Sequence, residues 1–138
     1  MVRINLVKPV KLADQHLIAE YNEILMLIGH IKKFPKINSQ PKEYTLGKGH
    51  MNFFKDKIKY LKTRHEKIKK EMQKRGFKTN KTIILQQFKK DQKKNWTPKS
   101  KDLQIIKKRI TTKIKSKPNY YRYYREKKPE KFLIDLLK

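Results

Sequence analysis

Three acid–base groups occur close together near the start of the chain, at His16, Glu20 and Glu23. In a helix, their spacing of four and three residues places them on one face. A carboxylate there can move a proton to or from a leaving group, or stabilise positive charge on a sugar ring while a glycosidic bond breaks. An exposed glutamate paired with a lysine is the simpler alternative. However, residues 12–31 of this very basic chain contain no lysine or arginine, which favours a face that needs its carboxylates.

The sequence Met1-Val2-Arg3 offers a second reactive group. An α-amine has an ordinary pKa of about 8, so a useful fraction is neutral and nucleophilic near neutral pH. After removal of Met1, the primary amine of Val2 can attack a sugar C1′ and form an imine, as Schiff-base enzymes do. The simpler interpretation is that Met1 and Val2 only start the chain, and composition alone favours that interpretation.

A third candidate is the aromatic segment 120–124, in which four tyrosines surround Arg122. Tyrosine rings can stack on bases, and the interleaved cation can bind phosphates. Alternatively, the tyrosines close the core with their hydroxyls at the surface. We expect about half of them to do so.

Length and composition limit the possible classes of protein. A chain of 138 residues predicts one domain with a modest core. Its net charge of +26 favours a polyanionic partner, DNA or RNA ahead of an acidic membrane. The chain has no cysteine, and its four histidines lack the spacing of metal ligands, so we expect no metal site. Without a membrane-spanning stretch or a signal peptide, we expect an intracellular protein of the cytoplasm or nucleoid.

The basic residues are 32 lysines and only 6 arginines. This bias is typical of an AT-rich genome, so part of the charge can be drift on solvated faces. The few arginines are then the more informative residues, and bidentate phosphate contact is a physical reason to keep a guanidinium. They are Arg3, Arg64, Arg75, Arg109, Arg122 and Arg125.

Apolar residues at helical spacing predict three main helices, at about 12–30, 50–75 and 97–115. Gly29 is the expected stop of the first helix and Gly76 that of the second. Residues 77–96 are expected to be mainly loop with one helical turn, and 129–138 a short amphipathic helix. With no strand pattern and no repeat, the sequence predicts an all-α single domain, 1–138, with long irregular connections.

Five stretches of the chain resemble the pyrimidine-dimer DNA glycosylases of the phage endonuclease V type. They are residues 1–6, 12–24, 44–57, 74–77 and 113–124. The resemblance implies a compact helical enzyme that cuts the N-glycosidic bond at a cyclobutane pyrimidine dimer and then cleaves the abasic site by β-elimination. It implies no cofactor, and double-stranded DNA with photoproducts or abasic sites as substrate. We also expect a monomer. A viral or prokaryotic origin is consistent with it.

The resemblance also assigns roles to individual residues. The family nucleophile, the α-amine after the initiator methionine, falls on Val2, where threonine is common. The essential glutamate falls on Glu23. The residues matching those that contact DNA or line the family's site are Arg3, Gln15, His16, Arg109 and Lys113, together with the lesion-recognition segment Tyr120, Tyr121, Arg122 and Tyr123.

Two positions depart from the family pattern. Asn22 and Met26 occupy positions where the phage enzyme has arginines beside the scissile sugar; Asn22 can still donate hydrogen bonds there. This leaves open the same imine chemistry on another damaged base or an abasic site. A non-catalytic basic DNA-binding protein that kept the fold is a third possibility. Joint retention of Arg3, Gln15, His16 and Glu23 argues against it, because a pure binder of polyanions would gain by losing the Glu23 charge.

Overall fold

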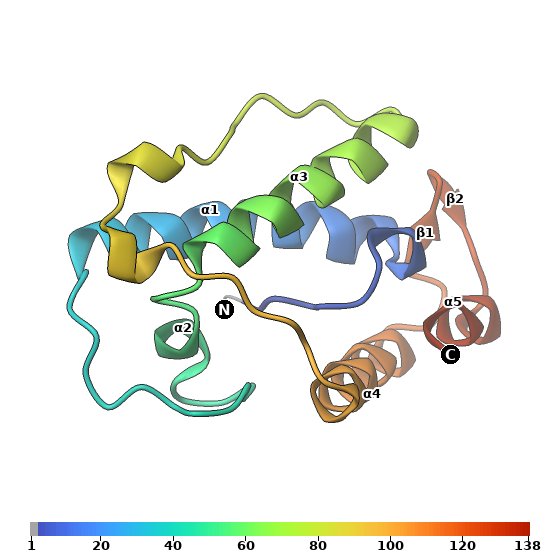
Figure 1. Cartoon of the computed structure of the whole chain (residues 1–138). Coiled ribbons are helices and arrows are strands. Elements are labelled where there is room, and N and C mark those ends of the chain that lie inside the picture. The colour runs from blue at the N-terminus through green and yellow to red at the C-terminus, as the bar shows by residue number, and fades with distance from the viewer. Residues whose placement is uncertain (1–2) are drawn as a thin grey trace.

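The computed structural model describes residues 3–138, and its architecture is all-α, as predicted (Figure 1). Two long helices, α1 and α3, pack along each other, while α4 and α5 pack together on the other side of the N-terminal segment. The helices are α1 (Asp14–Lys33), α2 (His50–Phe53), α3 (Ile58–Lys74), α4 (Ser100–Ser116) and α5 (Glu130–Leu137). A two-stranded hairpin, β1 (Arg122–Tyr123) and β2 (Glu126–Lys127), precedes α5.

The first helix is longer than its predicted range. It continues through Gly29 to Lys33, so the expected stop at Gly29 is wrong. A glycine inside a helix costs only about 1 kcal/mol, and the fully buried Ile31 beyond it packs into the core. The helix ends at Lys33, because Pro35 disfavours the helical conformation of Phe34, the residue before it.

The predicted helix at 50–75 is interrupted at residues 54–57. The side-chain amide of Gln40 donates to the carbonyl oxygens of Asn52 and Phe53, at 3.1 and 2.9 Å. The Lys57 ammonium also donates to the Phe53 carbonyl, at 2.8 Å. Side chains thus take the acceptors that a continuous helix would use, and α2 separates from α3. The predicted end at Gly76 is confirmed by its φ of 86°.

The remaining boundaries differ in smaller ways. α4 begins at Ser100, three residues later than expected, because the Asp102 carboxylate accepts the Lys99 N–H at 2.9 Å and caps the helix there. Residues 77–96 are mainly loop with two short 3₁₀ turns, Leu85–Gln87 and Lys90–Gln92. α5 matches the expected C-terminal helix.

The hairpin was not predicted, because its turn lacks the glycine or asparagine that such turns favour. Tyr124 and Arg125 have φ angles of 52° and 71°. Their backbone N–H groups donate to the two carboxylate oxygens of Asp14, at 3.1 and 2.7 Å. A carboxylate from the start of α1 therefore stabilises a turn whose own sequence does not favour it.

Two of the six arginines are buried in ion pairs and are therefore not phosphate ligands. Arg75 is the first. Its guanidinium is buried and pairs with Asp14 at 3.0 Å and Glu71 at 2.9 Å. It also lies 4.6 and 4.8 Å from the ring centroids of Tyr123 and Tyr124. Arg75 thus joins the end of α3 to the start of α1 and to the hairpin.

Arg64 is the second buried arginine. It makes a two-pronged ion pair with the fully buried carboxylate of Glu20, at 2.8 and 3.0 Å, and donates to the Val7 carbonyl. The expected shared face of His16, Glu20 and Glu23 is therefore divided, because Glu20 points into the core toward α3. Its charge serves the packing of α1 against α3.

The N-terminal segment runs between α3 and α4 (Figure 1), and its backbone is held by side chains. The Ile4 N–H donates to His50 Nε2 at 3.0 Å, and the Tyr44 hydroxyl donates to the Ile4 carbonyl at 2.8 Å. Because Nε2 is an acceptor, the ring proton is on Nδ1, which donates to the Thr45 carbonyl at 2.6 Å. A neutral His50 is thus part of the anchor.

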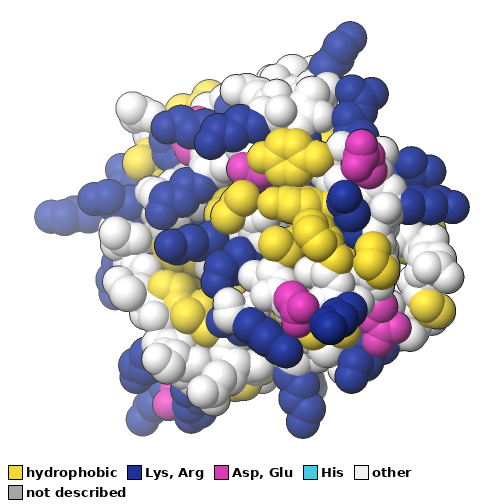
Figure 2. All heavy atoms as spheres, turned by 90° about the vertical axis from the view of Figure 1, so that its right-hand side faces the viewer, with side chains coloured by type: hydrophobic (Ala, Val, Ile, Leu, Met, Phe, Trp, Pro, Cys, Tyr) yellow, Lys and Arg dark blue, Asp and Glu magenta, His cyan; other side chains and the backbone are white. Residues whose placement is uncertain are grey.

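The face formed by the hairpin and α5 carries an apolar patch. Val10, Tyr124 and Phe132 are exposed there, and Figure 2 shows apolar side chains gathered at its centre with lysines and arginines around them. Leu133 and Leu137 lie on the buried side of α5. Among the described residues, no helix has the length and apolar character needed to cross a membrane.

Replacing Arg75 with methionine should lower the free energy of unfolding by about 3–5 kcal/mol, because Asp14 and Glu71 then keep buried charges without their partner. Urea denaturation measures this change. Lys70→Met, on an exposed position of the same helix, is the matched control and should change stability by less than about 0.5 kcal/mol. Equal effects of the two substitutions would contradict this role for Arg75.

His50 should make stability depend on pH. Burial lowers the pKa of His50 from 6.5 to about 4, and the charges of Arg3 and Arg109 add to this effect. The unfolded chain therefore binds the proton first, and stability is lost as pH falls from 6.5 toward 4. His50→Gln can make the same two hydrogen bonds without titrating. The difference in unfolding free energy between wild type and variant should change by up to about 3 kcal/mol between pH 6.5 and pH 4. If stability depends on pH in the same way in both proteins, His50 is not the titrating group.

Candidate active site

A cavity of about 260 Å³ opens between α1, α4 and the N-terminal segment, and half of the predicted site residues line it. Its lining is mostly polar, with four cationic side chains and one carboxylate among the described residues. The lining residues are Arg3, Asn5, His16, Ala19, Glu23, Arg109, Lys113, Ser116, Lys117 and Tyr121.

Glu23 supplies that carboxylate. Its Oε1 accepts the backbone N–H of Arg3 at 2.9 Å, so it contacts the N-terminal segment directly. Burial raises the pKa of the Glu23 carboxyl above its ordinary value, although the Arg3 hydrogen bond and the Arg109 charge oppose this shift. A half-buried carboxyl with a raised pKa can give or take a proton closer to neutral pH than an exposed glutamate.

His16 and Tyr121 form one wall of the cavity. Their rings are 4.7 Å apart at an angle of 37°. Burial, with help from the charges of Arg109 and Lys113, lowers the pKa of His16 from 6.5 to about 4. The imidazole is therefore neutral near pH 7, and it presents a flat polar ring rather than a cation.

Basic side chains of α4 and of the residue that follows it also line the cavity. Arg109, Lys113 and Lys117 are four residues apart and line the same cavity. Arg3 joins them from the N-terminal segment, and burial together with the charge of Arg109 lowers the pKa of its guanidinium. Four cations around one carboxylate suit a substrate that carries phosphates.

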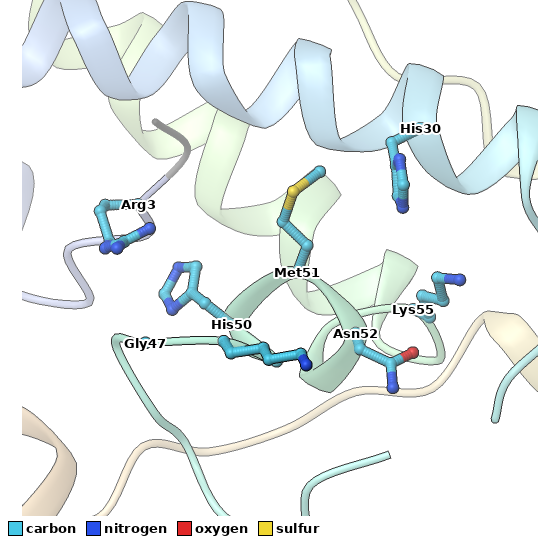
Figure 3. Close-up of a pocket in the computed structure, with 9 residues that line it drawn as sticks. Arg3, His30, Gly47, His50, Met51, Asn52 and Lys55 are labelled. Atoms are coloured by element: carbon cyan, nitrogen blue, oxygen red, sulfur yellow. The ribbon is translucent and has the colours of Figure 1, made fainter. Parts of the chain in front are cut away.

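A second and larger hollow, of about 650 Å³, lies on the other side of Arg3. Figure 3 shows His50 and Met51 of α2 between Arg3 and His30 of α1. Lys48 and Lys55 also line it, and its described lining contains no carboxylate. This basic hollow extends the cationic surface away from Glu23.

Five predicted site residues in the described part of the chain do not line the cavity, and two of them, Gln15 and Asn22, belong to α1. Gln15 instead contacts the aromatic segment: its amide donates to the Tyr120 carbonyl at 3.0 Å, and its Oε1 accepts the Arg122 N–H at 3.0 Å. Asn22 is exposed, and its amide donates to the Ile18 carbonyl of its own helix at 3.2 Å.

The residues of the aromatic segment 120–124 have different surroundings in the structure. Tyr121 is buried and lines the cavity, whereas Tyr120 is exposed with the Lys117 ammonium 4.8 Å from its ring centroid. Arg122 is also exposed. Tyr123 points away from the cavity, because its hydroxyl donates to the Val10 carbonyl at 2.8 Å. The expectation that about half of these tyrosines serve packing is consistent with this division.

Sequence reasoning missed several lining residues. Lys117 follows Arg109 and Lys113 at the same four-residue step, so that spacing was a usable signal. Asn5 and Ser116 carried no comparable signal. Val2, the predicted nucleophile, lies outside the described residues. Among the described residues, no group of three or more His, Asp or Glu side chains could hold a metal ion.

A family model for pyrimidine dimer DNA glycosylases matches residues 1–85. The matched range includes Arg3, His16 and Glu23. Arg109 and Tyr121 lie beyond it, yet they line the same cavity, so the unmatched part of the chain completes a site that the matched part begins. Since the match covers more than half of the sequence, the chain belongs to the pyrimidine dimer DNA glycosylase family.

Proposed function

We propose that this member of the family is bifunctional: it excises cyclobutane pyrimidine dimers from duplex DNA and then cleaves the resulting abasic site as a lyase. The nucleophile is the α-amine of Val2 after removal of Met1. Glu23 transfers protons and stabilises the positive charge that develops on the sugar. The reaction needs no cofactor.

The observation that carries this proposal is the 2.9 Å hydrogen bond from the Arg3 backbone N–H to Glu23 Oε1. Arg3 directly follows Val2, and a trans peptide bond keeps consecutive α-carbons about 3.8 Å apart. Chain connectivity alone therefore limits how far the α-amine of Val2 can be from the carboxylate. A nucleophile and a proton-transfer group within reach of each other are the minimum that imine catalysis requires.

In the first step, the neutral amine attacks C1′ of the deoxyribose. The N-glycosidic bond breaks, its electron pair leaves with the pyrimidine, and the proton lost by the amine balances the proton gained by the base. The C1′–O4′ bond then opens with protonation of O4′, which leaves an imine between C1′ and the amine. Glu23 faces the positive charge of this sequence and relays its protons.

In the second step, the imine makes the C2′ proton acidic. Loss of that proton breaks the C3′–O bond, and the electron pair departs with the phosphate on the 3′ side. Water then hydrolyses the imine and frees the amine. Arg109 and Lys113 are suited to bind the phosphates that flank the lesion, because both line the cavity beside Glu23.

One observation favours a second candidate, the same imine chemistry with a different lesion range. Met26 is 59% exposed, and Asn22 bonds back to its own helix, so neither residue supplies a cation beside the cavity. The lesion preference can be measured by comparing the enzyme's activity on three duplexes. One contains a thymine dimer, one an abasic site and one a deaminated base.

Replacing Glu23 with glutamine should reduce dimer excision at least about 100-fold, because the amide can neither relay the proton nor balance the charge. Borohydride trapping on a duplex with a thymine dimer measures the loss, and trapping on a preformed abasic site should persist. Glu126→Gln, at a side chain that is 76% exposed, is the matched control and should leave both reactions unchanged. Full dimer excision by Glu23→Gln would contradict the assigned role.

Keeping Met1 should abolish trapping on both substrates, because the reactive amine then belongs to a different residue. Val2→Leu should retain Met1, since a large second side chain hinders removal of the initiator, whereas Val2→Ala should lose it and stay active. Mass spectrometry establishes the first residue of each protein before trapping. An efficient adduct from protein that still begins with Met1 would exclude the Val2 amine as the nucleophile.

A further inference from the structure

We propose that Gln15 is a positioning residue that holds Tyr121 against His16, rather than a ligand of DNA phosphates. The inference rests on the proposed function for its effect on dimer excision, but its structural part can be tested independently. It assigns Gln15 a role different from the phosphate contact that the family resemblance implies.

The Gln15 side chain forms hydrogen bonds with the backbone on both sides of Tyr121. The Gln15 amide nitrogen donates to the carbonyl of Tyr120, and its amide oxygen accepts the N–H of Arg122, each at 3.0 Å. These groups are the backbone neighbours of Tyr121 on either side. One side chain therefore fixes both peptide groups that set the direction of the Tyr121 ring.

The residues beside Gln15 contact the same segment. Asp14 accepts the N–H groups of Tyr124 and Arg125, and His16 lies 4.7 Å from the Tyr121 ring. The first turn of α1 thus contacts the aromatic segment through three consecutive side chains. In this arrangement Tyr121 closes one wall of the cavity that contains Glu23.

The hydrogen bonds of Gln15 also argue against the alternative, in which Gln15 binds a DNA phosphate. In the structure, one amide N–H and the acceptor oxygen are engaged with the backbone. A phosphate could therefore be bound only through the second N–H of the amide. Gln15 is also absent from the cavity lining that contains Arg109 and Lys113. The cations that line the cavity can bind phosphates without Gln15. Phosphate binding therefore does not explain why residue 15 is a neutral amide.

The test compares Gln15→Met, which keeps the shape but removes both bonds, with Gln15→Lys, which adds a cation. Gln86→Met, at an exposed position, is the matched control. Three quantities are measured: the single-turnover rate of thymine-dimer excision, the affinity for undamaged duplex, and the His16 pKa from NMR titration of the imidazole signals. Thermal melting of all three variants checks that they fold.

The positioning role predicts that Gln15→Met lowers the excision rate about tenfold, the effect of two lost hydrogen bonds, with unchanged affinity for undamaged duplex. The His16 pKa should rise from about 4 toward 6.5, because Tyr121 no longer shields the ring. Gln15→Lys should also excise slowly, although its added charge strengthens DNA binding. Gln86→Met should match wild type in all three measurements.

A phosphate ligand predicts the opposite pattern. Gln15→Met would then bind undamaged DNA more weakly, Gln15→Lys would restore both binding and excision, and the His16 pKa would remain at about 4 in both; this result overturns the inference. If the wild-type protein excises no lesion, the proposed function fails while the His16 titration still decides the role of Gln15.

Discussion

The whole site depends on one constraint: the polar backbone of the buried N-terminal segment must find hydrogen-bond partners away from water. The chain meets this need with side chains from three separate regions. Glu23 accepts the Arg3 N–H, His50 accepts the Ile4 N–H, and Tyr44 donates to the Ile4 carbonyl. The carboxylate proposed for catalysis is therefore also one of the anchors. Under the proposed function, the hydrogen bond that fixes Arg3 also limits how far the proposed nucleophile can be from Glu23.

The carboxylates of α1 divide between buried ion pairs and the cavity. Glu20 and Asp14 pair with buried arginines, and these pairs fix α1 against α3. Glu23, one turn beyond Glu20, lies instead in the cavity among cations. The absence of lysine and arginine from residues 12–31 thus has two physical causes. A lysine on the inner face would leave a buried charge unpaired, and one beside Glu23 would compete with the N-terminal segment for its carboxylate.

Much of this arrangement could be predicted from the sequence, because helix periodicity and the family motif are local signals. The interruption of the helix at 54–57 could not, since it depends on Gln40, which is distant along the chain. The hairpin turn at Tyr124 could not be predicted either, because Asp14, which stabilises it, is also distant along the chain. Among the candidate site residues, the resemblance located Glu23 and Arg3 in the cavity, but it did not reveal that Gln15 contacts backbone instead.

The most direct test of the account is to locate the covalent bond itself. Protein with a native start is trapped with borohydride on a duplex that contains a thymine dimer, then digested, and the modified peptide is sequenced by mass spectrometry. We predict a single sugar adduct on the α-nitrogen of Val2. An adduct on a lysine side chain such as Lys113, with the N-terminus unmodified, would contradict the central claim that the α-amine of Val2 is the nucleophile.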